Sequence, residues 1–204
     1  MNREYRNMTF QVKEDGAEPS FLVEGYATTF KPYKLIEIGG EDYNERIEPT
    51  AFDEADLSDV VYRIDHAGKV FARSSAGTVK LNIDEHGLYQ ITDLSRTKAG
   101  QEHFEEVRAG NYPHMSFAFT VKEDHYEADT RTRVIDRVGK VFDISAVSFP
   151  ANPTTELHVR DYFDGVIEAE KAAEAERLAA EEERRRDLER REELKKQIEE
   201  VLAL

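Results

Sequence analysis

A serine at the start of a strand-like segment is the first residue in this sequence with a clear chemical use. Ser116 follows turn residues at positions 110–113, and the side chains after it alternate as they do in a β-strand. Small side chains share the face of Ser116, whereas Phe117 and Phe119 lie on the opposite face. Because the aromatic face belongs in a core, we expect Ser116 where a reacting group meets solvent.

A serine nucleophile needs a base. Its hydroxyl is a poor nucleophile until an imidazole accepts the proton, and the imidazole works best when a third group fixes its tautomer. His66 lies where the predicted strand 60–65 opens into a turn, and we interpret it as that base. His114 is the rival, because it lies two residues before Ser116, about 7 Å away along the strand. Spacing alone does not separate these catalytic interpretations from structural ones.

The residue patterns needed for a metal site, a thiolate nucleophile or a phosphate-binding loop are absent from the sequence. The six histidines form no HExxH pair or other compact metal-ligand spacing, and cysteine is absent, so we expect no zinc site and no thiolate chemistry. Gly39 and Gly40 are not followed by the Lys and Ser or Thr of a phosphate-binding loop. The sequence therefore predicts neither a metal nor a cofactor.

The charge of the chain argues against two classes of partner. A net charge of −15 over 204 residues argues against a general nucleic-acid binder, which needs surplus Lys and Arg to neutralise phosphates. Binding to anionic membranes is disfavoured for the same reason. No apolar run approaches the length that spans a bilayer, and the amino terminus shows no signal-peptide pattern. We predict no nucleic-acid and no membrane partner.

The first part of the chain is typical of a mainly β (α+β) domain. Strand-like segments recur about every ten residues with few helical patterns between them, which indicates a β-barrel or sandwich with flanking helices. We predict a helix at residues 97–109, capped by Gly110, and loops at 39–49 and 123–132. Residues 133–149 are expected to form a hairpin around Gly139.

Composition changes sharply near residue 163. We therefore predict one domain at residues 1–163 and a helical tail at 164–204, which contains little beyond Glu, Arg, Ala, Leu and Lys. Many acid–base pairs are spaced four residues apart, but the coiled-coil stripe is interrupted by charged residues. The tail is either a solvated single helix or weak coiled coil, or a helix that binds a specific partner.

Several short segments together carry a resemblance that the spacing alone does not provide. Residues 64–68 (IDHAG), 115–119 (MSFAF) and 142–153 (FDISAVSFPANP) resemble the tailed-phage prohead proteases, which act in capsid maturation. Residues 47–52 (IEPTAF) look like the segment before the first helix of that family, with Thr50 where Gly is more usual. The resemblance runs from about Gly25 to Pro153, in the order of the family. The other matching segments are residues 70–73 (VFAR), 74–78 (SSAGT), 84–88 (DEHGL) and 107–110 (VRAG).

The resemblance implies roles for individual residues. The family is similar to the herpesvirus assemblins, which have a β-barrel surrounded by helices, a serine nucleophile and a histidine base. Ser116 matches the serine of the M-S-F motif, and His66 matches the histidine of the D-H motif. Asp143, the acid before the S-x-V-x-x-P-A motif, corresponds to the group that orients the imidazole. Asp65 is a poorer orienter, because neighbouring strand residues point to opposite faces.

The group that stabilises the oxyanion stays open. Backbone N–H groups are one possibility, and the arginines Arg73, Arg131 and Arg133 are the other.

The implied function is a serine endopeptidase that processes scaffold and coat proteins, and itself, inside the assembling procapsid in the host cytoplasm. The tail would then be a docking helix or a scaffold-like extension, removed by self-cleavage near Gly165. A homo-oligomer is expected by analogy with the assemblins. The alternative is a non-enzymatic capsid-assembly scaffold or binding module that oligomerises through its carboxyl-terminal helix. Esterase activity is disfavoured because no serine lies in a G-x-S-x-G motif.

Overall fold

The computed structural model describes residues 3–9, 21–148 and 153–202. The chain divides into two compact units, Met1–Val159 and Arg160–Leu204, and each is described by itself. The predicted compositional boundary at residue 163 stays a prediction.

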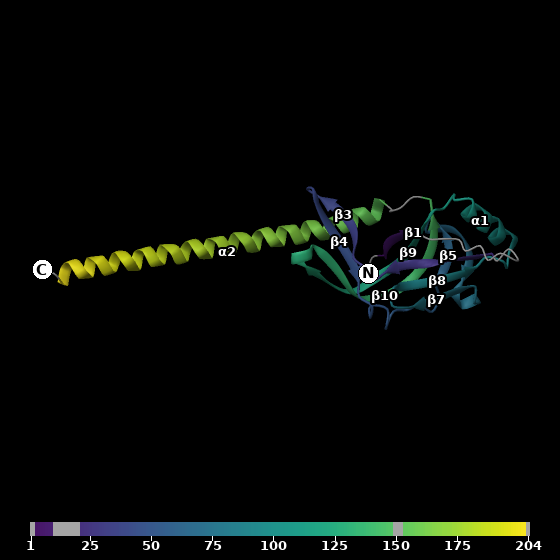
Figure 1. The fold of residues 1–204 in the computed structure, drawn as a ribbon, viewed down its shortest axis with the longest axis horizontal. Helices are drawn as coiled ribbons and strands as arrows, with labels where there is room; N and C mark the ends of the chain where they lie inside the picture. The colour runs from purple at the N-terminus through teal and green to yellow at the C-terminus, as the bar shows by residue number, and fades with distance from the viewer. Residues whose placement is uncertain (1–2, 10–20, 149–152, 203–204) are drawn as a thin grey trace. The chain divides into compact units, whose positions relative to one another are not determined.

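Strands dominate the described residues of the first unit (Figure 1). They are accompanied by helix α1 (Lys98–Arg108) and the short 3₁₀ turns Ser74–Ala76 and Ala128–Thr130. The strands are β1 (Arg3–Thr9), β2 (Leu22–Thr29), β3 (Tyr33–Ile38), β4 (Glu41–Ile47), β5 (Val61–Ile64), β6 (Ala67–Arg73), β7 (Val79–Ile83), β8 (Gly87–Asp93), β9 (His114–Glu127) and β10 (Thr132–Val147).

The strands form two sheets. The seven-stranded sheet has the order β1-β9-β10-β4-β3, with β5 beside β10 and β6 beside β5, and the three-stranded sheet has the order β2-β8-β7. Strand β10 is antiparallel to β9 and parallel to both β4 and β5, which pair with opposite ends of it. The mainly β prediction is confirmed. The described strands do not close into a single barrel.

One hydrophobic cluster joins the two sheets and the helix. It includes Val23 and Leu88 from the smaller sheet, Phe117 and Ile144 from the larger, and Phe104 from α1. Thus the aromatic face of the Ser116 strand lies in the core, as predicted. Helix α1 also agrees with its prediction, because it lies within residues 97–109 and Gly110 follows it with a φ of 83°. The side chain of its N-cap, Thr97, accepts a hydrogen bond from the backbone N–H of Gly100.

Three predictions about connections are wrong. The expected loop at 39–49 is largely strand β4, which is joined to β3 through Gly39 and Gly40 at φ 64° and 87°. The expected loop at 123–132 is the end of β9 and a tight turn before β10. The expected hairpin around Gly139 is instead one continuous strand, in which Val138 and Lys140 pair with Val121 and Thr120. The glycine between them is an extra residue in the ladder, which is typical of a β-bulge.

A buried cluster of charges connects β1 to strands far from it in sequence. Glu45 is fully buried and bonds Arg6 from β1, and the Tyr33 hydroxyl donates to it at 2.5 Å. Arg133 from β10 lies 3.4 Å from Glu45 and donates to Glu4 at 2.7 Å. Burial alone would lower the pKa of Arg6, but the charge of Glu45 raises it above its usual value.

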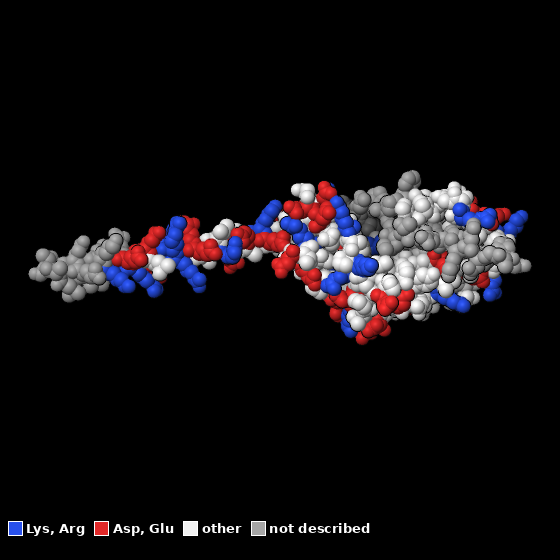
Figure 2. Space-filling view, in the orientation of Figure 1, with Lys and Arg blue, Asp and Glu red and all other residues white. Residues whose placement is uncertain are grey.

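The second unit consists of helix α2, which spans Pro153–Leu202 and so begins before that unit. Ion pairs spaced four residues apart join Glu182 to Arg186 and Asp187 to Arg191, and acidic and basic side chains follow one another along it (Figure 2). The predicted tail helix is confirmed over its described length. Neither described helix has a stretch long and apolar enough to cross a bilayer.

Replacing Glu45 by Ala should lower the free energy of unfolding by about 3–5 kcal/mol, because Arg6 and Arg133 would then be buried with less compensating charge. The matched control is Glu41→Ala, which removes an exposed pair with Arg131 and should cost about 0–1 kcal/mol. Urea denaturation measures both values. Equal, small losses would contradict the structural role given to the buried cluster.

Candidate active site

His66 lies in a two-residue turn between β5 and β6. Ile64 pairs with Ala67, and the turn residues Asp65 and His66 have φ values of 44° and 55°. Two-residue hairpins of this kind need positive φ at both positions, which non-glycine residues adopt uncommonly. The turn is therefore a conformation that its surroundings must hold in place.

Hydrogen bonds to the end of β10 hold that turn. The Asp65 N–H donates to the carbonyl oxygen of Ala146 at 3.0 Å, and the Ser148 N–H donates to Asp65 Oδ1 at 3.1 Å. On the other side, Arg63 Nη1 donates to the carbonyl oxygen of His66 at 3.3 Å. The Asp65 carboxylate is thus used in anchoring the turn.

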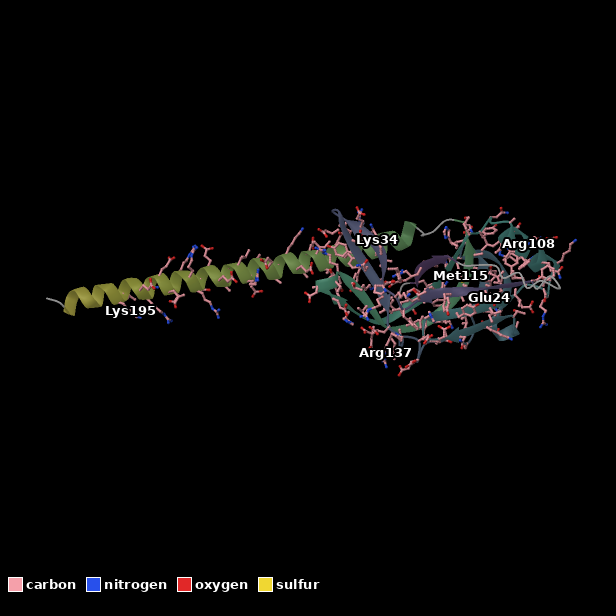
Figure 3. All side chains as sticks on the ribbon, viewed as in Figure 1. Glu24, Lys34, Arg108, Met115, Arg137 and Lys195 are labelled. Atoms are coloured by element: carbon pink, nitrogen blue, oxygen red, sulfur yellow. The ribbon has the colours of Figure 1, made fainter. Side chains whose placement is uncertain are left out.

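Ser116 lies near the start of β9, next to Met115, which Figure 3 labels. It pairs with Ser145 on β10 on one side and with Asn7 on β1 on the other. Ser116 is fully buried in this structure. Ser116 therefore lies on a strand, as predicted, but the predicted contact with solvent is wrong.

The three residues selected from the sequence form one hydrogen-bonded chain. His66 Nε2 lies 2.7 Å from Ser116 Oγ, and His66 Nδ1 lies 2.6 Å from Asp143 Oδ1. An ionised carboxylate only accepts hydrogen bonds, so the imidazole proton belongs on Nδ1. Nε2 then has a free lone pair that accepts the hydroxyl proton of Ser116. This arrangement has the connectivity of a serine–histidine–acid triad.

Strand β10 explains how these residues meet despite their separation in sequence. Asp143 pairs with Val61 on β5 and with Ala118 on β9. The carboxylate therefore lies between the strand that leads into the His66 turn and the strand that carries Ser116.

Ser145 is a further member of the site that the sequence reasoning missed. Its Oγ donates to Asp143 Oδ1 at 2.8 Å and accepts a hydrogen bond from the His66 N–H at 3.3 Å. The residue is fully buried. A signal was present, because Ser145 lies two residues after Asp143 and so shares its strand face.

Tyr5 was also missed. Its ring meets the His66 imidazole edge-on, with 4.5 Å between the centroids. Together with the sheet, this contact leaves the His66 side chain 10% exposed and the Asp143 side chain 4% exposed. Hydrogen bonds in such a secluded place are electrostatically stronger than in water.

The other candidates do not bond Ser116 among the described residues. His114, two residues before Ser116 on β9, pairs with Val147, and the imidazole that reaches Ser116 is that of His66. Arg133 pairs with Tyr126, ten residues along β9 from Ser116, or roughly 30 Å away along the strand, and cannot serve an oxyanion there.

Two further oxyanion candidates are in surface ion pairs. Arg73 lies 3.5 Å from Asp59, and Arg131 lies 2.9 Å from Glu41.

Within the described residues, no group of three or more His, Asp or Glu side chains is arranged to hold a metal ion.

Comparison with known proteins bears on the identity of this site. A family model of the caudovirus prohead serine proteases matches residues 8–165, which include His66, Ser116 and Asp143. Curated proteins and solved structures gave no match. Since the family model covers most of the chain, the protein belongs to the caudovirus prohead serine protease family.

Proposed function

We propose that this protein is a serine endopeptidase of capsid maturation, with Ser116 as nucleophile, His66 as general base and Asp143 as the group that orients His66. The observation that carries the proposal is the hydrogen-bonded chain from Ser116 Oγ through the imidazole to the carboxylate. Membership in the prohead protease family supports the same reaction.

Acylation follows from the positions of the protons. Ser116 Oγ attacks the scissile carbonyl carbon as its proton passes to His66 Nε2, and the carbonyl π electrons move to oxygen. Asp143 stabilises the resulting imidazolium through Nδ1–H. Collapse of the tetrahedral intermediate breaks the C–N bond, and the imidazolium gives its proton to the departing amine.

Deacylation uses the same groups with water in place of the hydroxyl. His66 removes a proton from water, the hydroxide attacks the acyl carbon, and Ser116 Oγ leaves with the returned proton. Ser145 holds the carboxylate and the backbone of His66 together during both steps, and Tyr5 limits the water that reaches the imidazole.

The substrates in this proposal are the scaffold and coat proteins of the procapsid, and the protease itself, inside the procapsid in the host cytoplasm. The part of α2 that follows Gly165 acts as the docking helix or scaffold-like extension, and self-cleavage near Gly165 removes it. The resemblance to assemblins adds a homodimer, and α2 offers a second surface for self-association, as a coiled coil. A scaffold without enzymatic activity would share these surfaces but would have no use for the Ser116–His66 pair.

Substituting Ser116 by Ala should abolish processing without unfolding the protein, because it removes only the attacking oxygen. Wild type and Ser116→Ala are incubated alone and with the coat and scaffold proteins encoded beside them, and intact masses are followed over time. Fragments from the wild type that are missing in the variant are the expected result. Identical unprocessed masses, from a wild type that assembles with its partners, would favour the non-enzymatic scaffold.

Substituting Asp143 by Asn should reduce kcat by about 10³- to 10⁴-fold, because an amide no longer selects the imidazole tautomer whose Nε2 accepts a proton. Rates are measured on a cleavage site mapped with the wild type. Asp136→Asn is the matched control, since Asp136 lies on the same strand but pairs with the exposed His125. A normal rate for Asp143→Asn would remove Asp143 from the proposed triad.

A further inference from the structure

Arg63 lies on the same side of the sheet as the proposed triad. It is directly opposite Ser145 on β10, and Ser145 is directly opposite Ser116 on β9. Residues paired across neighbouring strands share a face of the sheet, so these three side chains form a row. With strands about 4.8 Å apart, the Cα of Arg63 is about 10 Å from that of Ser116.

The guanidinium of Arg63 has no carboxylate partner among the described residues. Its hydrogen bond there runs from Nη1 to the carbonyl oxygen of His66, and its Nε is buried without an acceptor. The other well-shielded arginines of the sheet differ in this respect. Arg6 pairs with Glu45, Arg46 with Glu48 and Glu127, and Arg133 with Glu4 and Asp124.

This lack of a partner is unexpected on physical grounds. Asp and Glu number 43 in the chain, against 28 Lys and Arg, so acids to neutralise a cation are abundant. A buried donor without an acceptor destabilises the protein unless something outside the described residues satisfies it. The planar guanidinium fork matches a carboxylate in two parallel hydrogen bonds. A carboxylate that arrives with the substrate would pair with the Nη groups and neutralise the guanidinium, whose one hydrogen bond to a described residue goes to a neutral carbonyl oxygen.

We propose that Arg63 binds the carboxylate of an Asp or Glu side chain in the substrate, and so makes this protein selective for acidic residues near the cleaved bond. The inference rests on the proposed peptidase function. The separation from Ser116 sets the range, because about 10 Å corresponds to about three residues of extended peptide. The acidic residue therefore lies within about three positions of the scissile bond.

Two randomised decapeptide libraries test the proposal. They are identical except that one contains Asp and Glu where the other contains Asn and Gln, and mass spectrometry aligns the cleavage sites. The wild type should cleave peptides with an acid within three positions of the cut about 10- to 100-fold faster than the matched amides. Arg63→Gln should reduce this ratio to about one while still cleaving, and Arg63→Glu should favour Lys and Arg at that position.

Arg73→Gln is the control, since Arg73 is in an ion pair with Asp59, and it should keep the preference for acids. Thermal unfolding establishes that each variant is folded. If Arg63→Gln does not fold, Ser116→Ala and Ser116→Ala/Arg63→Lys are compared for binding of a fluorescent acidic peptide, with several-fold weaker binding expected for the second because Lys lacks the fork.

Two results would overturn the proposal. One is an acid preference that persists in Arg63→Gln, or undiminished peptide binding in the Lys variant. The other is an equal loss of rate on both libraries, which would assign Arg63 to the reaction itself and not to selection of substrate. Cleavage that does not depend on Ser116, or no cleavage by the wild type, would instead refute the proposed function.

Discussion

The pairing of β10 with β5 on one side and β9 on the other is the constraint on which the candidate site depends. Asp143 is on the shared strand, so its carboxylate reaches the imidazole that the β5–β6 turn presents to Ser116 on β9. A shift of one residue in either ladder would turn the carboxylate or the serine toward the opposite face, because the side-chain period of a strand is two. The geometry of the site is thus set by backbone hydrogen bonds between strands.

The turn that carries His66 is a second consequence of this arrangement. Positive φ in non-glycine residues costs on the order of 1–3 kcal/mol each and persists only where the surroundings determine the conformation. Here the end of β10 provides those surroundings, since Ala146, Ser148 and Ser145 bond Asp65 or His66. The strand that supplies the carboxylate therefore also fixes the backbone of the base. The end of β10 thus both orients the imidazole and holds the strained turn in place.

Features that depend on neighbouring residues could be predicted from the sequence. Helix α1 ends before Gly110, the strand of Ser116 shows alternation, and α2 is built from strong helix formers. The residues of the candidate triad were selected by short motifs, and the structure brings all three together. Ser145 and Arg63 were missed, because their roles depend on which strands lie beside them, and β5 and β10 are far apart in sequence.

Strand β4 shows why local pattern failed elsewhere. Tyr43, Glu45 and Ile47 are buried in alternation, so the period of a strand is present, but a carboxylate occupies the central inward position. A buried charge is tolerated only when partners compensate it. Those partners, Arg6 and Arg133, come from β1 and β10. Because both are distant from β4 in the sequence, the local pattern alone indicates a charged loop. The same cluster anchors β1, whose Tyr5 packs on His66. Glu45, the residue that made β4 look like a loop in the sequence, thereby helps to hold Tyr5 against His66 in the candidate active site.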